Sequence, residues 1–397
     1  PHNGHSNSFS SLLEILDPQR FTRGIPVTPD ARDAVMVRRL KRDLRALGSG
    51  QFPDRRVMEL ALEHRDGQWW QRVGDEAPVA LGGEASAVEV ELSHQLAHYT
   101  ALVRPAKGPG RLVFVNLQKR LLSSVEAFAR TLQLHARAVG KGGVASQEPE
   151  LDEDDDLDDE TREELDGAAD EGRSRTLPAV TGEVRKLLDE MLALAQKHRD
   201  GPDARFLALV RWIRANQCEG VAYPRGRKAP WGDRRVILFT EYGDTKRWLV
   251  NLLTAAVEGT EGGRERVMQF HGGMSDEARE AVQRAFNSAA NDHPVRILVA
   301  TDAAREGVNL QGHCADLFHF DIPWNPARME QRNGRIDRTL QPAPEVRCHY
   351  FVLPQRAEDQ VLRTLVRKVA RIEDELGSLS AVVMDRLTDA LATGIDD

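Results

Sequence analysis

The sequence has 397 residues, a length that accommodates two or three domains, each with its own hydrophobic core. Apolar residues make up 41% of the chain and charged residues 29%, which is ordinary for a globular protein. No run of apolar residues is long enough to span a membrane, and the amino terminus lacks the basic and apolar regions of a signal peptide. We therefore expect no membrane-spanning segment in this sequence.

The chain begins with Pro1 rather than Met, which indicates a cut made inside a longer protein. Its cysteines, Cys218, Cys314 and Cys348, are scattered and odd in number, which favours a reducing compartment over a disulfide framework. We therefore expect a cytoplasmic location.

The negative charge is concentrated in one stretch. The net charge is −8, yet residues 148–171 contain fifteen Asp and Glu residues and a single arginine, a local net charge of −14. The remainder carries about +6, so the folded parts are mildly basic.

This acidic stretch has too few large apolar residues to build a core, so we expect a solvated, disordered linker. A calcium loop is disfavoured because the Gly and Glu spacing of an EF-hand is absent. A third interpretation is a nucleic-acid mimic that shields the basic surface when DNA is absent.

Helices are expected on both sides of the acidic stretch, from apolar residues at three- and four-residue spacings over 112–134, 184–195 and 204–215. His94 and His98 lie one turn apart in another helical segment. With no third ligand nearby they are more typical of surface or core histidines than of a metal site, so no metal-binding residue is predicted.

From residue 233, short apolar runs alternate with amphipathic helices. Strands are predicted at 236–239, 267–270, 297–300, 317–320 and 346–352, and helices at 245–256, 276–286, 326–334 and 357–376. Apolar strands that are each followed by a helix indicate an α/β domain with an open, doubly wound parallel sheet. Ligands bind such sheets at the carboxyl ends of the strands.

The segment 331–338 is the strongest functional signal at that edge. Arg335 and Arg338 are three residues apart near a helix end, and guanidinium groups suit phosphate oxygens at any working pH. Such a pair can neutralise the charge on a transferring γ-phosphoryl group. The alternative is a salt-bridged surface helix that uses Glu330 and Asp337, but Gln331 at its fixed offset and the ordered segments before it favour a function.

These ordered segments, FTEYGDT, QFHGGMS, ILVATDAAREGVNLQ, FDIPWNP and QRNGRIDR, resemble motifs IV, V and VI of superfamily 2 helicase-like proteins. The motif QRNGRIDR and the residues that follow it resemble bacterial Snf-type ATPases. Among these are the RNA-polymerase-recycling ATPases and the Snf-like helicase of DISARM anti-phage systems. PHNGHSNSF resembles the continuation of motif III, and VMVRRLKRDL resembles the segment that leaves the first lobe. The resemblance implies the RecA-like C-terminal lobe of a helicase, with the tail of a first lobe before it.

The resemblance also implies residue roles. Arg338 is similar to the arginine finger, Arg335 to its companion at the γ-phosphate, and Gln331 to the glutamine near the nucleotide. Further ATP-binding residues are implied at Glu306, Gly307, Asn309 and Gly334. Contacts with the nucleic-acid backbone are implied at Thr240, His271, Gly272 and Thr301.

The resemblance implies an ATP-dependent translocase with ATP and Mg²⁺ as cofactors. The chain contains neither GxxxxGK[ST] nor a DExH-like acidic box, so the Mg²⁺ ligands are expected in a missing N-terminal RecA-like lobe, and this fragment is not expected to hydrolyse ATP alone. Double-stranded DNA is the expected substrate, with RNA as the alternative, and defence-system or transcription proteins are the expected partners. AREGVNL lacks the adjacent glycines of eukaryotic remodellers, which argues against nucleosome remodelling.

Two other functions fit the sequence less well than a translocase. A non-catalytic binding module would not need Gln331, Arg335 and Arg338 together. A dinucleotide-binding enzyme is disfavoured because no GxGxxG follows a predicted strand.

The expected domain organisation has six parts. They are a remnant of the first lobe (1–60), a mainly helical insertion (61–147), the acidic linker (148–172), a helical lead-in (173–232), the second RecA-like domain (233–352) and a helical brace (353–397).

Overall fold

The computed structural model describes residues 6–28, 31, 34–35, 52–82, 86–105, 108, 110–142, 158–302 and 309–376. The chain divides into two compact units, residues 1–49 with 150–155, and residues 50–149 with 156–397. In the first unit, helix α1 (Ser6–Leu16) buries Leu13, and Ser10 Oγ accepts a hydrogen bond from the Gly24 amide at 3.0 Å.

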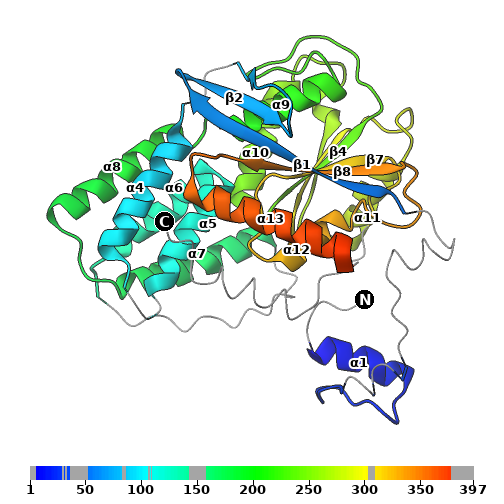
Figure 1. Ribbon diagram of the computed structural model, residues 1–397, viewed down its shortest axis with the longest axis horizontal. Helices are drawn as coiled ribbons and strands as arrows, with labels where there is room; N and C mark the ends of the chain where they lie inside the picture. Colours follow the sequence, from blue (N-terminus) through cyan, green and yellow to red (C-terminus); the bar gives the residue numbers. More distant parts are fainter. Residues whose placement is uncertain are drawn as a thin grey trace. The chain divides into compact units, whose positions relative to one another are not determined.

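The second unit is built on an eight-stranded sheet with the order β3-β2-β1-β8-β7-β4-β6-β5 (Figure 1). The strands are β1 (Asp54–Arg65), β2 (Gln68–Val73), β3 (Val79–Ala80), β4 (Arg235–Thr240), β5 (Val267–Phe270), β6 (Ile297–Thr301), β7 (Cys314–His319) and β8 (Glu345–Val352). Neighbours from β1 to β5 in this order are parallel, and β2 and β3 extend the β1 edge antiparallel.

The helices of this unit are α4 (Val88–Val103), α5 (Gly110–Ser123), α6 (Val125–Ala138), α7 (Asp159–Arg175), α8 (Gly182–His198), α9 (Ala204–Asn216), α10 (Gly243–Val257), the 3-10 turn η1 (Gly263–Arg266), α11 (Asp276–Asn287), α12 (Pro326–Asn333) and α13 (Ala357–Leu376). Helices α4 to α8 form a bundle beside the sheet, shown in cyan and green in Figure 1.

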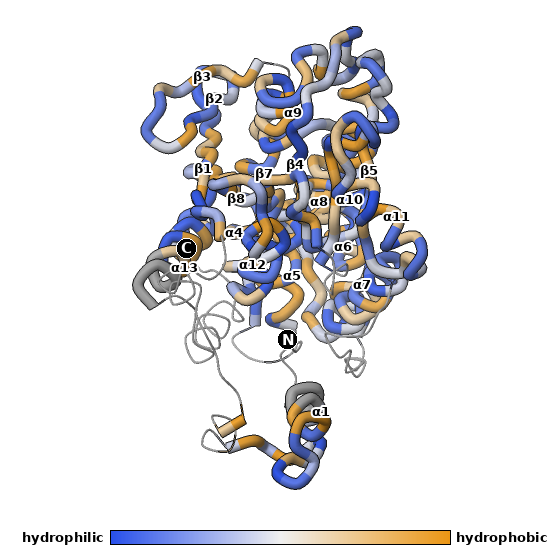
Figure 2. The backbone as a smooth tube through the Cα atoms, turned by 90° about the vertical axis from the view of Figure 1, so that its right-hand side faces the viewer, coloured by the Kyte–Doolittle hydropathy of each residue, from blue (hydrophilic) through white to orange (hydrophobic). Residues whose placement is uncertain are grey.

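Helices cover both faces of the sheet centre, which explains why its strands are mainly apolar rather than alternating between apolar and polar residues. All residues of β4 and β6 are buried. Because side chains alternate between faces, Val236 and Leu238 pack with α9 and α10, whereas Ile237 and Phe239 pack with α11. Figure 2 shows the hydrophobic segments gathered in the sheet and hydrophilic ones on outer helices such as α11. The predicted open parallel α/β sheet is confirmed.

The helical bundle has its own core, to which Leu96 of α4, Phe114 of α5, Phe128 of α6 and Met191 of α8 contribute. A smaller cluster joins the bundle to the sheet, where Val115 of α5 packs with residues of β8, α12 and α13. The bundle therefore packs directly against β8 and against α12, the helix that carries Gln331.

Three boundaries differ from the sequence prediction. Strand β1 begins inside the range expected to be a first-lobe remnant, and it pairs in parallel with β8 of the main sheet. The range 61–147, expected to be mainly helical, opens with the β1–β2 hairpin, whose turn places Asp66 and Gly67 at positive φ. The single helix expected at 112–134 is two helices, because Ser124 has extended φ and ψ and its Oγ caps α6 through the Ala127 amide.

The acidic stretch also differs from its prediction. Residues 159–175 form helix α7, and the Asp158 side chain caps it by accepting a hydrogen bond from the Thr161 amide at 2.7 Å. The helix forms because neighbouring cations offset its charge, among them Arg120 with Asp166 and Lys246 with Asp159. Residues 148–157 of the predicted linker lie outside the described residues.

In the part of the chain that the structure describes, no helix has both the length and the apolar character needed to cross a membrane. Cys218, Cys314 and Cys348 are all buried, and none of the three forms a disulfide.

Candidate nucleotide and nucleic-acid site

The predicted site residues gather at one edge of the sheet. Strands β4 to β7 are parallel, so their carboxyl ends lie together, and Thr240, His271 and Thr301 stand at or directly after these ends. Helix α12, which carries Gln331, follows β7 at the same edge. The structure therefore brings the predicted nucleic-acid residues and the arginine-bearing helix to one region.

Helix α12 is anchored to this edge by Arg332, whose side chain is 2% exposed. Its Nε and Nη2 donate to the two carboxylate oxygens of Asp302 at 2.6 and 2.7 Å, and its Nη1 donates to the Asp321 carbonyl oxygen at 2.8 Å. Burial alone would lower the pKa of Arg332, but Asp302 and Asp321 raise it above its ordinary value. Arg332 is therefore a charged, structural anchor rather than a phosphate ligand.

The hydroxyl of Thr240 is held by Asp321. Thr240 Oγ1 donates to Asp321 Oδ2 at 2.5 Å, and Ser123 Oγ at the end of α5 donates to the same oxygen at 2.6 Å. Thr240 is fully buried, and burial raises the pKa of Asp321 above its ordinary value. A phosphate would reach Thr240 only if the Ser123 and Asp321 contacts opened.

Thr301 and the loop after β5 each meet an acidic residue of the α7 amino terminus. Thr301 is 1% exposed, and its Oγ1 donates to Asp159 Oδ1 at 3.1 Å. Gly273 has φ +76° and approaches so closely that an added Cβ would lie 2.3 Å from Asp158 Cβ. His271 Nδ1 lies 2.6 Å from the Gly272 carbonyl oxygen, so the side chain turns back on its own loop.

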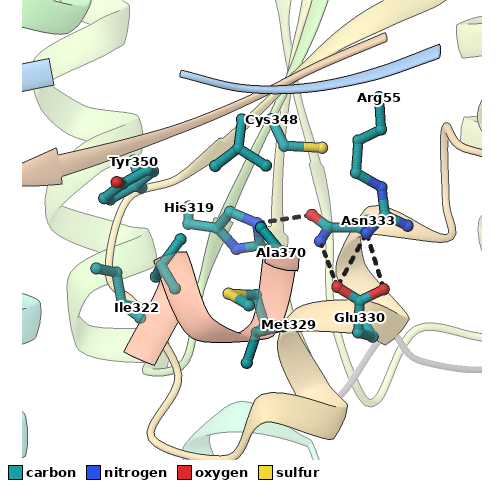
Figure 3. Close-up of a pocket in the computed structure, with 12 residues that line it drawn as sticks. Arg55, His319, Ile322, Met329, Glu330, Asn333, Cys348, Tyr350 and Ala370 are labelled. Carbon is teal, nitrogen blue, oxygen red and sulfur yellow. Dashed lines mark hydrogen bonds and ion pairs between the residues drawn. The ribbon is translucent and has the colours of Figure 1, made fainter. Parts of the chain in front are cut away.

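A second anchor joins α12 to strand β1 (Figure 3). Arg55 Nη1 donates to both carboxylate oxygens of Glu330 at 2.9 and 2.8 Å, and Arg55 Nε donates to Asp337 Oδ2 at 2.7 Å. Asn333 Nδ2 donates to Glu330 Oε1 at 3.0 Å, and Asn333 Oδ1 lies 2.9 Å from His319 Nε2. Glu330 and Asp337 therefore do form ion pairs, as the alternative of a salt-bridged helix predicts. Their partner in these pairs is Arg55 of β1.

A cavity of about 20 Å³ lies beside this anchor, between α12, α13 and the sheet. His319 lines it, and burial lowers the pKa of His319 to about 3, so the imidazole is neutral. The volume suits a single water molecule and excludes a nucleotide.

The two anchors leave another side of the α12 segment at the surface. Gln331 and Arg338 are exposed, and Arg335 is half-buried. Arg338 Nη1 donates to Asn309 Oδ1, so two of the predicted nucleotide-binding residues touch. Gly334 is the carboxyl-terminal cap of α12, with ordinary φ of −60°, and its amide donates to the Glu330 carbonyl oxygen at 2.9 Å.

Two predicted ATP-binding residues, Glu306 and Gly307, lie outside the described residues. His94 and His98 are exposed on α4. Across the residues with described positions, no group of three His, Cys, Asp or Glu side chains is arranged to hold a metal ion.

Comparisons with known proteins define the class of this region. Residues 232–339 match the helicase conserved C-terminal domain. The chain is 32% identical over 151 residues to the uncharacterized ATP-dependent helicase YqhH of Bacillus subtilis, which is 38% of this chain and 25% of that protein. It is 35% identical over 98 residues to the RNA polymerase-associated protein RapA of Klebsiella pneumoniae, which is 25% of this chain and 10% of that protein.

Among solved structures, the C-terminal part of the Fun30 ATPase domain is similar with a TM-score of 0.40 and 14% identity, over 86% of this chain and 97% of that one. The chain therefore contains a RecA-like helicase C-terminal lobe and is similar to superfamily 2 helicase-like proteins. It spans about a quarter of YqhH and a tenth of RapA.

Sequence reasoning missed the residues that hold this edge together. Asp302 and Asp321 directly follow strands β6 and β7, so their position was a usable signal of site carboxylates. Arg55 gave no such signal, because it lies 275 residues from Glu330 in the sequence.

Proposed function

We propose that this chain supplies the second lobe of a Snf-type, nucleic-acid-dependent ATPase that translocates on double-stranded DNA. In this proposal Arg335 and Arg338 neutralise the transferring phosphoryl group, and Gln331 lies near the nucleotide. Asn309, which contacts Arg338, belongs to the same surface. Glu306 and Gly307, which precede it in the sequence, complete the proposed set of ATP-binding residues.

One observation carries this proposal. Two arginines of one segment differ in how their charge is offset: Arg332 is buried between Asp302 and Asp321, whereas Arg338 is exposed and donates to the neutral side-chain oxygen of Asn309. A surface guanidinium just after an anchored helix, whose contact among the described residues is a neutral amide oxygen, favours an incoming anion over a structural ion pair.

The residues present fit one half of an ATP site. When bound, ATP with Mg²⁺ supplies the phosphoryl group that is transferred, and guanidinium groups are suited to its charge. The chain has no phosphate-binding GxxxxGK[ST] loop, so Mg²⁺ and most phosphate contacts would come from an N-terminal RecA-like lobe. Gly334 contributes by ending α12 rather than by offering its amide to a ligand.

Nucleic acid would bind at the same edge, through Thr240, His271, Gly272 and Thr301. Contacts with phosphates carry no base sequence information, which suits a motor that must not stop at particular sequences. The similarity to RapA favours a transcription-associated role over the anti-phage role that the DISARM resemblance implies, with RNA polymerase or defence proteins as the respective partners. The three cysteines, which form no disulfide, favour the cytoplasm.

The test uses a protein in which this chain is joined to its first lobe. Arg338→Ala should lower nucleic-acid-stimulated ATP hydrolysis by roughly 10³-fold while leaving the melting temperature unchanged, because the side chain is exposed. Arg338→Lys should restore little activity, since an ammonium group does not reproduce the planar fork. Arg264→Ala is the matched control, because Arg264 is 77% exposed and pairs with Glu258.

Normal turnover by a stable Arg338→Ala protein would overturn the assignment of Arg338. A second contrary outcome is that neither the unaltered protein nor its variants hydrolyse ATP, although all of them bind nucleic acid. That outcome would replace the ATPase with the rival function, a non-catalytic binding module.

A further inference from the structure

We infer that helix α7 is an internal competitor of nucleic acid: its first acidic residues occupy the phosphate-contact positions at the sheet edge and must leave when a nucleic-acid backbone binds. This inference rests on the proposed function. The helix begins at Asp159, and the contacts come from Asp158, Asp159 and Glu163.

The first contact joins Asp159 to the end of β6 and to α10. Asp159 Oδ1 accepts from the Thr301 hydroxyl at 3.1 Å, and Asp159 Oδ2 accepts from Lys246 Nζ at 2.6 Å. The Lys246 and Asp159 side chains are only 6% and 7% exposed. A carboxylate thus occupies a position where a hydroxyl and an ammonium group converge.

The second contact joins Glu163 to the first turn of α10, directly after β4. Glu163 Oε1 accepts from the Asp244 amide, and Glu163 Oε2 accepts from Arg247 Nη2 at 2.6 Å. Gly243 makes the approach possible, because an added Cβ would lie 2.8 Å from Glu163 Oε1 and 2.9 Å from Asp159 Cβ. The amide, the guanidinium and the small residue form a site for an anionic group.

The third contact lies at the loop after β5. The added Cβ at Gly273 would meet Asp158 Cβ, so the cap of α7 sits against the loop that carries His271. Asp158 is exposed, and hydrogen bonds from Thr161 together with the nearby His271 lower its pKa, so it is a carboxylate at neutral pH.

These contacts use the donors that bind phosphate: backbone amide, hydroxyl, ammonium and guanidinium groups. They come from the ends of β4, β5 and β6, which are adjacent in the sheet. One short acidic segment therefore satisfies donors after β4 and at the end of β6 and packs against the loop after β5, so it follows three neighbouring strand ends as the phosphates of a backbone would. The position of Thr301 and His271 beside α7 also explains why the predicted nucleic-acid residues are covered in this structure.

The attachment of α7 is polar and therefore open to competition. Its buried residues are Asp159, Asp170, Gly172 and Ser174, none of them large and apolar. Its far end is tied to the bundle through Asn116 with Asp170 and His135 with Ser174. A polyanion offers the same charge to Lys246 and Arg247, so the acidic end of the helix can be exchanged for phosphates while the other end keeps its partners.

The experiment measures binding of the 397-residue chain to a short fluorescent DNA duplex at fixed salt. Asp159→Asn combined with Glu163→Gln should tighten binding by at least about fivefold, because the unliganded site is no longer occupied by carboxylates. Glu160→Gln combined with Glu164→Gln removes the same charge from exposed positions of α7 and should change affinity by less than about twofold. Thermal melting checks that each variant is folded.

Hydrogen exchange of the unaltered chain gives a second measurement that needs no variant. Added duplex should speed amide exchange in the first turns of α7. The inference is wrong if the chain binds duplex but the affinity of the Asp159/Glu163 variant rises no more than that of the control. It is also wrong if duplex binds and amide exchange in α7 is unchanged. In both cases the proposed function stands. If no form binds DNA or RNA, the nucleic-acid part of the proposed function fails as well.

Discussion

At the scale of single residues, two arginines have different roles, one within α12 and one in the turn after it. Arg332 is buried and its charge is balanced by Asp302 and Asp321, whereas Arg338 is exposed beside Asn309. A buried guanidinium needs partners that offset its loss of hydration, and Asp302 and Asp321 provide them. The buried Arg332 therefore has a structural role. Exposure leaves Arg338 available for a ligand, although the sequence QRNGRIDR does not distinguish the two.

We predict that Arg332→Met destabilises the protein by about 3–5 kcal/mol, because Asp302 and Asp321 would remain buried without their cation. Urea unfolding of the 397-residue chain measures this loss. Arg264→Ala should cost less than about 0.5 kcal/mol, since that pair is exposed. Equal effects of the two substitutions would show that Arg332 is not an anchor.

A second prediction concerns Glu89, which is fully buried in α4. Burial and the nearby Asp203 raise the pKa of Glu89 to about 7, although Arg205 and Arg356 lie near enough to oppose this. A carboxyl whose folded pKa lies above its unfolded value of 4.5 stabilises the protein most below pH 4.5, and this contribution is lost as pH rises through 7.

Glu89→Gln should therefore melt near the unaltered protein at pH 5 and several degrees above it at pH 8. The buried His135, whose pKa is lowered to about 4, acts in the same way in both proteins, so the difference isolates Glu89. A constant difference in melting temperature between pH 5 and pH 8 would contradict a raised pKa.

At the scale of secondary-structure elements, strand β1 restrains the arginine-bearing helix. Arg55 of β1 forms ion pairs with Glu330 inside α12 and with Asp337 after it. We predict that Arg55→Ala, in a protein that includes the first lobe, lowers kcat for ATP about 10- to 100-fold with little change in KM, because α12 loses its position.

The neighbouring Arg56→Ala is the control, since Arg56 is 67% exposed and pairs with Glu345. Arg55→Lys should rescue little, because one ammonium group does not span two carboxylates. A fall in melting temperature with unchanged kcat would show that the Arg55 contacts stabilise the fold without positioning α12.

The sequence predicts some strands and helices of the fold better than others. The strands from β4 to β8 and helix α13 follow from apolar runs and periodicity, since burial on both faces leaves a local pattern. Strand β1 was missed because its pairing with β8 joins segments far apart in sequence, although Asp66-Gly67 was a hairpin signal. Helix α7 was missed because its stability depends on cations of other elements, such as Lys246, Arg247 and Arg120.

The candidate site was predictable where it is a local motif. Gln331, Arg335 and Arg338 follow from spacing and resemblance, and the structure places them on or directly after one short helix. The ion pairs of Arg332 and Arg55 were not predictable, because each joins residues that only the folded sheet edge brings together.

At the scale of the whole molecule, the helical bundle and the sheet meet where the phosphate contacts are proposed. Ser123 at the end of α5 donates to Asp321, and α7 contacts the ends of β5 and β6. If nucleic acid binds as proposed, the bundle contacts the same edge, and the exposed Arg338 lies in the turn after α12. We expect the nucleic-acid stimulation of hydrolysis to pass through this shared edge.

The last prediction concerns the chain as one half of a nucleotide site. It carries guanidinium groups for phosphate but no GxxxxGK[ST] loop, so the 397-residue chain should show no ATP hydrolysis above background. Adding the first lobe in trans, or joining it to this chain, should produce hydrolysis that rises with duplex DNA. The same mixture with Arg338→Ala should stay near background, whereas Arg264→Ala should match the unaltered chain, because Arg338 belongs to the proposed site and Arg264 pairs with Glu258 away from it. Phosphate release measures all four samples. Robust turnover by the isolated chain would contradict a site divided between two lobes, since every phosphate and Mg²⁺ ligand would then have to lie within this sequence.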